Sequence, residues 1–265
     1  MKTILITGST DGIGKLTAIK LAYDGHQIIL HGRNPGKLKK TLEEIKVATK
    51  NNNIYSVTAD LADTLSIHKM ISKISKEYSC IDVLINNAGV FKSSIAKNNK
   101  NLDLRFAVNF IAPYLLTNGL LSLLNNSSAP RIINLSSAAQ ATVAIEALKG
   151  NTPISSNEAY AQSKLALTMW SFDFAKKHQK TITIAVNPGS LLNTNMAIEA
   201  YGKYWSSADK GAHILYELAT LAKHESANGK YFDNDKGDFA KAHIDAYNQE
   251  KIEQLILETN KILKR

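Results

Sequence analysis

A tyrosine and a lysine four positions apart are the residues of this chain best suited to proton transfer. Tyr160 and Lys164 lie in a stretch, residues 158–167, that is dominated by Ala, Gln, Lys and Leu without Gly or Pro, so it is predicted to be helical. Side chains at this spacing are neighbours on one helix face. An ammonium beside a phenol lowers the phenol's pKa, and the tyrosine could then exchange a proton with a substrate near neutral pH. By itself the pair is ambiguous, because the same spacing is common on solvated helices.

A glycine-bearing turn near the N-terminus follows a short β-branched run. The segment Gly8-Ser-Thr-Asp-Gly-Ile-Gly14 stands between a predicted strand and a predicted helix, the context of a dinucleotide fingerprint. Gly8 would permit the tight turn, Gly12 the approach of a pyrophosphate, and Gly14 close packing of helix on sheet. The first two glycines are three residues apart rather than one, and the glycines could instead form only a permissive turn. The cofactor contacts expected here are Gly8, Ser9, Thr10, Gly12, Ile13 and Gly14.

The elements that would position these residues alternate along the chain. Short apolar runs predict strands at residues 3–7, 27–31, 54–58, 81–85, 131–135, 181–186 and 230–232. Helices are expected at residues 15–24, 35–50, 63–78, 101–124, about 158–178, 206–224 and 245–263. This alternation predicts an α/β fold with a single doubly wound, mostly parallel sheet of the Rossmann type and helices on both faces. No linker-like segment divides the chain, so we expect one domain over residues 1–265.

Composition narrows the classes of function. The chain has 265 residues, 44% hydrophobic and 21% charged, with a formal net charge of +9, and its lysines are scattered, which argues against a nucleic-acid stripe. Cys80 is the only cysteine, and the seven histidines show no ligand spacing, so neither a disulfide nor a metal is expected. Neither a signal peptide nor a membrane-spanning segment is predicted. We expect a cytoplasmic enzyme without membrane insertion.

The end of the second predicted strand bears on cofactor choice. It reads His31-Gly-Arg-Asn34, with no acidic residue. An acid at this position would bind the ribose 2′-hydroxyl of NAD, whereas an arginine accommodates the 2′-phosphate of NADP. Arg33 could hold that phosphate in a forked, charge-assisted contact, although Asp11 places negative charge nearby. NADP(H) is therefore favoured, and NAD(H) stays an alternative.

Four motifs, taken in order, resemble those of the short-chain dehydrogenases/reductases: Thr7-Gly-x-x-x-Gly-Ile-Gly14, Asn86-Asn-Ala-Gly89, Ser137 and Tyr160-x-x-x-Lys164. The resemblance covers essentially the whole chain. It implies an oxidoreductase that moves a hydride between a nicotinamide and a carbonyl or alcohol carbon. Tyr160 would be the general acid or base, and Lys164 would bind the nicotinamide ribose and lower the tyrosine's pKa.

The resemblance implies two further catalytic residues. Ser137 would hydrogen-bond the substrate oxygen, orienting it and stabilising developing charge. Asn109 would hold a water in a proton relay through the lysine. Alternatively, Asn109 is a helix-interior amide whose polar atoms are satisfied by its neighbours. The catalytic set expected from the resemblance is Asn109, Ser137, Tyr160 and Lys164.

Other residues along the carboxyl ends of the strands would complete the cofactor site. Asp60 matches an acid beside the adenine, although an Asp there could simply cap a helix. Thr194 resembles the residue that holds the nicotinamide carboxamide, but it lies one position farther from Gly189 than is usual. The remaining cofactor contacts implied by the resemblance are Arg33, Asp60, Leu61, Asn87, Ala88, Gly89, Tyr160, Lys164, Pro188, Gly189 and Thr194.

Two segments bear on the substrate. Residues 140–157 make the interval between Ser137 and Tyr160 unusually long, could wall one side of the pocket, and resemble the retinol-dehydrogenase-like branch of the family. Residues 193–207 could form an apolar lid or pack beneath a helix; their apolar members include Met196, Ile198, Tyr201, Tyr204 and Trp205. A hydrophobic carbonyl or alcohol is expected as substrate.

Two other functions remain open. One is a catalytically silent dinucleotide-sensing or regulatory protein on the same fold, and the other is a related dehydratase or epimerase. The last helix is predicted to be a packing or subunit-contact helix. Relatives often pack through the helices that match those of Asn109 and Tyr160, so the resemblance is compatible with a homodimer or homotetramer.

Overall fold

One eight-stranded sheet runs through the protein, in the order β3-β2-β1-β4-β5-β6-β7-β8. The computed structural model describes residues 1–264, except for the side chains of residues 200 and 201. The strands are β1 (Thr3–Ile6), β2 (Gln27–Gly32), β3 (Ile54–Thr58), β4 (Val83–Asn86), β5 (Arg131–Leu135), β6 (Ile182–Asn187), β7 (Lys230–Asp233) and β8 (Asp238–Ala240). Neighbouring strands are parallel except β7 and β8. The predicted doubly wound α/β fold is confirmed; the short antiparallel β8 was not predicted.

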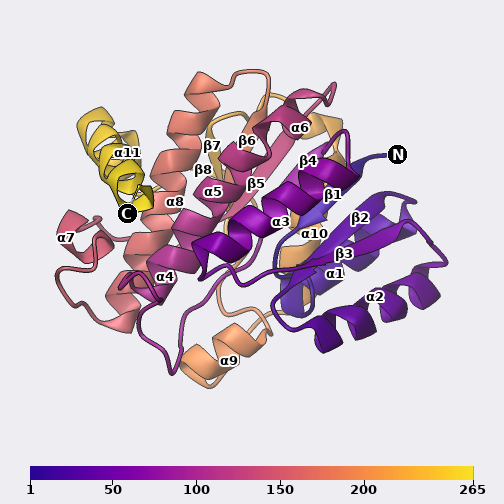
Figure 1. Cartoon of the computed structure of the whole chain (residues 1–265), viewed down its shortest axis with the longest axis horizontal. Helices are drawn as coiled ribbons and strands as arrows, with labels where there is room; N and C mark the ends of the chain where they lie inside the picture. Colours follow the sequence, from indigo (N-terminus) through magenta and orange to yellow (C-terminus); the bar gives the residue numbers. More distant parts are fainter. Residues whose placement is uncertain (265) are drawn as a thin grey trace.

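Helices cover both faces of the sheet (Figure 1). One face carries α1 (Gly12–Tyr23), α2 (Pro35–Thr49) and α10 (Ala208–Thr220), and the other carries α3 (Thr64–Glu77), α5 (Ala112–Gly119) and α8 (Ser156–Lys177). Each face has its own hydrophobic cluster. Successive residues of β1 point to opposite clusters, since Leu5 lies in one and Ile4 and Ile6 lie in the other. Both faces are thus buried, as a parallel sheet requires.

The predicted helix at residues 101–124 is not continuous. It is divided into α4 (Leu104–Phe106), a π-helical turn η1 (Ala107–Ile111), α5, and α6 (Leu121–Asn125). Within the π-turn, the N–H of Ala112 bonds to the carbonyl of Ala107, five residues earlier. Pro113 has no N–H to donate to the carbonyl of Asn109, four residues earlier. The apolar pattern concealed this interruption, although the proline was visible in the sequence.

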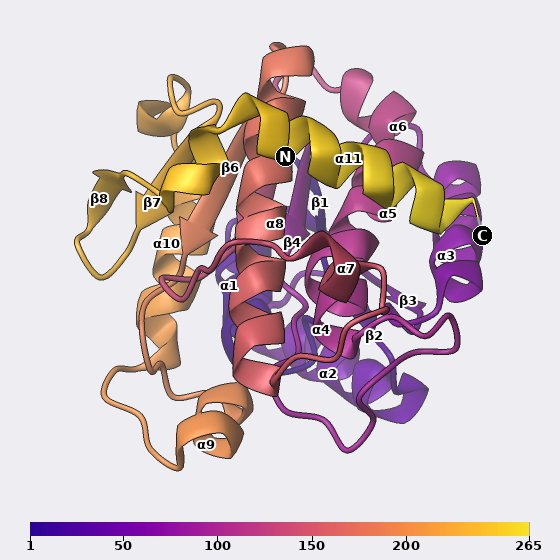
Figure 2. The same ribbon diagram turned by 90° about the vertical axis from the view of Figure 1, so that its left-hand side faces the viewer.

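Two helices in the predicted substrate segments were missed, α7 (Ile145–Leu148) and α9 (Asn195–Tyr201). The predicted closing helix is a short 3-10 turn, η3 (Ile244–Tyr247), followed by α11 (Gln249–Leu263); another such turn, η2 (Ala222–His224), follows α10. Figure 2 shows α11 crossing α8 and α5. There the hydroxyl of Tyr114 donates to Asn260 Oδ1 over 2.8 Å. The last helix therefore packs on its own chain, over the two helices that the resemblance linked with subunit contact.

None of the helices among residues 1–264 is long and apolar enough to cross a lipid bilayer. Within the same part of the chain there is no group of three or more His, Cys, Asp or Glu residues placed to hold a metal ion.

The side chain of His31 links the end of β2 to the loop after β1. Its Nδ1 accepts from the N–H of Gly8 over 3.1 Å, and its Nε2 lies 3.1 Å from the carbonyl oxygen of Ala59. Because Nδ1 is an acceptor, the neutral ring carries its proton on Nε2 and donates it to Ala59. Burial lowers the pKa of His31 to about 4. This role could not be predicted from the sequence, since a lone histidine in a strand matches no motif.

Replacing His31 with Gln should remove a pH dependence of stability. The pKa of about 4 in the folded protein lies below the ordinary value of 6.5. The stability that the neutral ring of His31 contributes is therefore fully present above pH ~6.5 and is lost as the pH falls toward 4. Between pH 7 and 4.5, the unfolding free energy of the wild type should fall by about 2–3 kcal/mol more than that of His31→Gln, measured by urea titration.

The matched control is His68→Gln, because His68 is exposed on α3. This variant should follow the wild type across the same pH range. If His31→Gln and the wild type lose stability in parallel, the ring of His31 does not carry the effect.

Candidate active site

A cavity of about 910 Å³ opens at the carboxyl ends of the central strands. Fourteen of the residues predicted to form the site line it together: Gly8, Thr10, Gly12, Ile13, Arg33, Asp60, Leu61, Asn87, Ala88, Gly89, Tyr160, Lys164, Pro188 and Thr194. The lining does not include Ser9, Gly14, Asn109, Ser137 or Gly189. The cavity brings the glycine turn and the Tyr–Lys pair to one place, although they are distant in sequence.

The glycine turn is shaped by close contact with the Asn86-Asn-Ala-Gly89 segment. Gly8 has a φ of +64°, and a Cβ there would lie 2.8 Å from the Cα of Ala88. A Cβ on Gly14 would overlap the side-chain amide of Asn87. That amide donates to the carbonyls of Thr7 and Gly8 over 2.8 and 3.0 Å. The turn therefore needs glycine at both positions, because of the positive φ at Gly8 and the close packing at Gly8 and Gly14.

Ser9 belongs to the framework of the turn rather than to the cavity. Its side chain is fully buried, and its Oγ accepts from the backbone N–H of His31 over 2.9 Å. Asp11 begins α1 as its N-cap, with a carboxylate that accepts from the N–H of Gly12 over 2.8 Å. The N-terminus of α1 thus faces the cavity, where its free N–H groups favour an anion.

Tyr160 and Lys164 are neighbours at the inner end of the cavity. Helix α8 begins with a capping box between Ser155 and Glu158, which places Tyr160 near its start. The Tyr160 ring packs edge-on against Phe91, with centroids 4.6 Å apart. Lys164 Nζ lies 5.6 Å from the centroid of the Tyr160 ring, as the i, i+4 spacing predicts.

The ammonium of Lys164 is enclosed by protein. Its Nζ donates to the carbonyl oxygen of Leu135, at the end of β5, over 2.6 Å. Burial disfavours the charged form and lowers the pKa of Lys164 to about 7. The lysine therefore changes charge close to neutral pH rather than far above it, a property that the spacing of the motif did not reveal.

The side chain of Asn109 is satisfied by neighbouring groups. Its Oδ1 accepts from the N–H of Val90 over 2.8 Å, and its Nδ2 donates to the carbonyl of Val90 and to Ser163 Oγ, each over 3.0 Å. Both amide N–H groups are therefore used. The side chain of Asn109 therefore fits the alternative of an amide that is satisfied by its neighbours. Its hydrogen bonds connect Val90, beside Gly89, to Ser163 on α8. A Cβ on Gly89 would lie 3.6 Å from Lys164 Nζ.

The two adjacent serines after β5 have different environments. Ser136 is buried, and its Oγ bonds to Thr168 Oγ1 over 2.7 Å and to the carbonyl of Lys164 over 3.2 Å. Ser137 is partly exposed, and its Oγ accepts from the N–H of Ala139 over 3.1 Å. The hydroxyl proton of Ser137 has no acceptor among the described residues, so it can be donated to a ligand.

The far end of the cavity is basic. Arg33 and Lys37 both line it, and Lys37 Nζ also lies 2.7 Å from a carboxylate oxygen of Asp11. The hydrogen bond from Lys37 holds the pKa of Asp11 below its ordinary value, and the lysine offsets the negative charge that weighed against NADP. Lys37 was missed from the sequence; the visible sign was a second cation four positions after Arg33, on the first turn of α2.

Asp60 and Thr194 line the cavity while also serving local structure. The Oδ1 of Asp60 accepts from the N–H of Ala62 over 2.9 Å, but the N-cap of α3 is Asp63, so the helix-capping alternative for Asp60 is wrong. Thr194 is the N-cap of α9, because its Oγ1 accepts from the N–H of Ala197 over 3.2 Å.

Only part of the apolar set of residues 193–207 lines the cavity. Met196 lines the cavity together with Glu199. In contrast, Ile198, Tyr204 and Trp205 are exposed, so they neither line the cavity nor pack beneath a helix. The side chain of Tyr201 lies outside the described residues.

The segment at residues 140–157 does not wall the cavity, contrary to expectation, since none of its residues belongs to the lining. It packs on the core instead. Leu148 of α7 is fully buried, and Thr142 Oγ1 donates to Asp245 Oδ2 over 2.7 Å. Tertiary contacts with the C-terminal segment, which local sequence does not show, determine this placement.

Known proteins share this sequence and fold. The family model described as short chain dehydrogenase matches residues 2–204. Retinol dehydrogenase 12 of Mus musculus is 32% identical over 247 residues, covering 89% of this chain and 78% of the relative. Polyprenol dehydrogenase of Homo sapiens is 30% identical over 275 residues, covering 96% of this chain and 82% of the relative.

A solved structure described as a short chain dehydrogenase from Shigella flexneri 2A str. 301, complexed with NADP, superposes with a TM-score of 0.71. The two chains are 26% identical, and the match covers 88% of this chain and 97% of that chain. The family match spans the glycine turn as well as Tyr160 and Lys164. This protein therefore belongs to the short-chain dehydrogenase/reductase family and is an NAD(P)-dependent oxidoreductase that acts on an alcohol or carbonyl group.

Proposed function

We propose that this protein is an NADP(H)-dependent oxidoreductase of apolar alcohols or carbonyls, with Tyr160, Lys164 and Ser137 as its catalytic residues. The observation that carries the proposal is the pairing of Tyr160 with Lys164 in the cavity lining, beside the end of β5. Lys164 Nζ bonds to the carbonyl of Leu135 over 2.6 Å, and Ser137 follows two positions later. Tyr160 lies beside the same lysine. The nicotinamide, when bound, supplies or accepts the hydride.

The residues of this chain suit a dinucleotide phosphate. The backbone at Gly8 and Gly12 leaves room at the N-terminus of α1, where a pyrophosphate is favoured. Lys37 offsets the charge of Asp11 at this end of the cavity, and Arg33 supplies the positive charge that would hold a 2′-phosphate by charge-assisted hydrogen bonds. The relative from Shigella flexneri complexed with NADP supports the same choice.

In the proposed mechanism, Tyr160 gives its hydroxyl proton to a carbonyl oxygen during reduction and removes it during oxidation. The charged form of Lys164 stabilises the phenolate that results. Ser137 donates its free hydroxyl proton to the same substrate oxygen, so charge that develops there is met by a fixed donor. Asn109 keeps the backbone beside the lysine in place through Val90 and Ser163.

The cavity walls favour an apolar substrate. The lining contains the apolar residues Val90, Phe91, Ile95, Leu104, Val108 and Met196, and also the polar residues Lys92, Ser93, Lys97, Asn98 and Asn99. The apolar side chains would contact the body of an apolar ligand, and polar groups would orient it. Two relatives are named for retinol and polyprenol, which are long apolar primary alcohols. We propose that the substrate resembles them in being a hydrophobic alcohol or its carbonyl counterpart.

Changing Tyr160 to Phe should abolish turnover and leave NADPH binding nearly intact. The substitution removes the proton donor but keeps the ring that packs on Phe91. Turnover of apolar aldehydes, ketones and alcohols would be followed by NADPH absorbance, and cofactor binding by fluorescence titration. The control is Tyr23→Phe, at an exposed position on α1. Substantial residual turnover in Tyr160→Phe would refute the proton-transfer role and leave open a sensing function.

Changing Arg33 to Ala should raise the KM for NADPH by about 10–100-fold, the cost of one charged hydrogen bond. The KM for NADH should change little, because NADH has no 2′-phosphate. Lys39→Ala, on an exposed part of α2 outside the cavity lining, removes the same charge and serves as the control. A wild-type preference for NADH in steady-state kinetics would overturn the NADP assignment.

Changing Lys164 to Met should remove both activity and a pH dependence of stability. In the folded protein without cofactor, burial lowers the lysine pKa from 10.5 to about 7. Between these values the unfolded chain binds more protons, so the stability of the wild type rises with pH. From pH 7 to 9, its unfolding free energy should gain about 2 kcal/mol relative to Lys164→Met in urea titrations. Parallel curves for the two proteins would show that Lys164 keeps an ordinary pKa.

A further inference from the structure

The backbone carbonyl of Ser137 is held by two side-chain donors. The hydroxyl of Tyr231, on β7, donates to it over 3.0 Å, and Gln140 Nε2 donates to it over 2.9 Å. We propose that Tyr231 is a positioning residue for the reaction, which fixes the Ser137 peptide so that the serine hydroxyl stays directed at the substrate oxygen. The inference rests on the role of Ser137 proposed above.

Tyr231 is well placed to act as a fixed donor. Its side chain is 4% exposed, and its strand lies between β6 and β8, paired with Ala185 and Ala240. Burial raises the pKa of the Tyr231 phenol above its ordinary value, so the hydroxyl stays protonated at neutral pH. Pairing on both sides of the strand fixes the backbone of Tyr231, and burial restricts its ring.

The hydroxyl of Ser137 depends on the backbone that Tyr231 holds. Ser137 stands two residues beyond the end of β5, outside the sheet ladder that orders Leu135. Its Oγ already accepts from the N–H of Ala139, so the remaining proton has a limited range of directions. Rotation of the Ser137 peptide would move that proton away from the ligand. Displacements of about 1 Å at a reacting group can cost 10²-fold in rate.

The second donor connects the serine loop to the C-terminal segment. While Gln140 Nε2 holds the carbonyl of Ser137, its Oε1 accepts from the N–H of His243 over 3.1 Å. Two residues farther on, Thr142 Oγ1 donates to Asp245 Oδ2 over 2.7 Å. Lys251 Nζ, on α11, lies 2.7 Å from the other oxygen of the same carboxylate. The loop is thus attached at three points to residues that follow β6.

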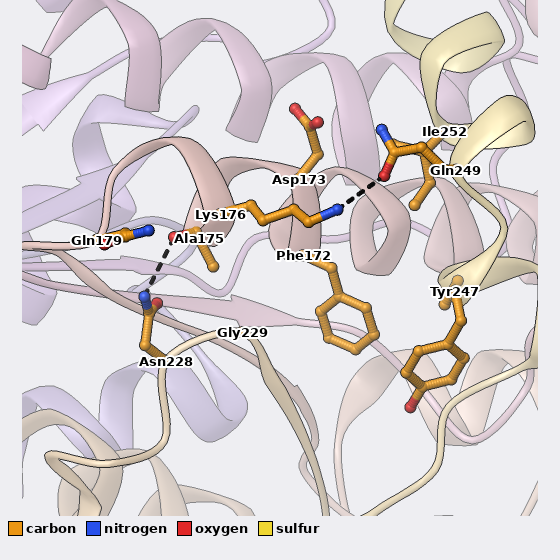
Figure 3. A pocket seen from close by; sticks show the side chains of 11 residues that line it. Phe172, Asp173, Ala175, Lys176, Gln179, Asn228, Gly229, Tyr247, Gln249 and Ile252 are labelled. Carbon is orange, nitrogen blue, oxygen red and sulfur yellow. Dashed lines mark hydrogen bonds between the residues drawn. The ribbon is translucent and has the colours of Figure 1, made fainter.

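The C-terminal segment is itself anchored on the helix that carries Tyr160. A hollow of about 580 Å³ lies where this segment meets α8, and Figure 3 shows side chains that line it. Lys176 Nζ donates to Gln249 Oε1 over 3.1 Å there, and the rings of Phe172 and Tyr247 lie 5.4 Å apart. The serine loop and the helix that carries Tyr160 therefore both contact the C-terminal segment.

The test is Tyr231→Phe, which removes the hydroxyl and keeps the ring. We expect kcat for an apolar aldehyde to fall about tenfold, the effect of one lost hydrogen bond, with the Kd for NADPH and the melting temperature nearly unchanged. The matched control is Tyr114→Phe, which loses a hydrogen bond of 2.8 Å to Asn260 far from the cavity and should keep the wild-type kcat. Gln140→Met removes the other donor and should also lower kcat. If one of the two variants fails to fold, the other still tests whether the Ser137 carbonyl must be held.

A double-mutant cycle separates positioning of Ser137 from a general effect. If Tyr231 acts through the serine, Tyr231→Phe should lower kcat no further in a Ser137→Ala background, measured in single turnovers of NADPH. An equal tenfold loss in both backgrounds would overturn the inference. Suppose that Ser137→Ala lowers kcat while Tyr231→Phe has the same kcat as Tyr114→Phe. This result would overturn the inference about Tyr231 but leave the function proposed for Ser137 in place. An unaffected Ser137→Ala would instead refute the function proposed for Ser137, and with it this inference.

Discussion

A buried ammonium is the constraint around which this active site is built. Lys164 is enclosed, and burial alone drives its pKa to about 7. A cation removed from water is tolerated only where fixed dipoles surround it. Here the carbonyl of Leu135 accepts from Nζ, while the hydroxyls of Ser136 and Thr168 bond to the backbone carbonyl of the lysine itself. The end of β5 and α8 are therefore held together by the group to which the proposed mechanism assigns a catalytic role.

A ladder of polar side chains below this lysine fixes the central strands to the helices. Asn86 Nδ2, on β4, donates to Asn134 Oδ1, on β5, over 2.7 Å, and Asn134 Nδ2 donates to Ser171 Oγ, on α8, over 2.8 Å. Asn86 Oδ1 has no hydrogen-bond partner among the described residues, but the buried bonds of Asn86 Nδ2 and Asn134 favour one arrangement of the core. The Asn86-Asn-Ala-Gly89 motif thus supports the sheet through its first residue and the glycine turn through its second. The positions of the residues at the site are therefore set by hydrogen bonds to the sheet.

Much of the fold was readable from the sequence, because strands buried on both faces are continuous apolar runs. The glycine turn, Tyr160 and Lys164 were found because their spacing is local. Other features depend on contacts between distant residues: His31 holds the turn 23 positions away, and Tyr231 reaches Ser137 across 94 positions. The three-residue β8 exists only as a partner for β7. The break near Pro113 was visible, but the apolar pattern around it concealed its effect.

The late position of Tyr231 and Asp245 has a consequence for how this protein is made. The ribosome releases the glycine turn, the serine and the Tyr–Lys helix well before the residues that hold the serine loop. The sheet can start to form from its N-terminal strands as they emerge. The serine loop, however, cannot be fixed until β7 and the segment after it have been synthesised. In the proposed mechanism, Ser137 would therefore be positioned only after β7 and the segment that follows it have been synthesised.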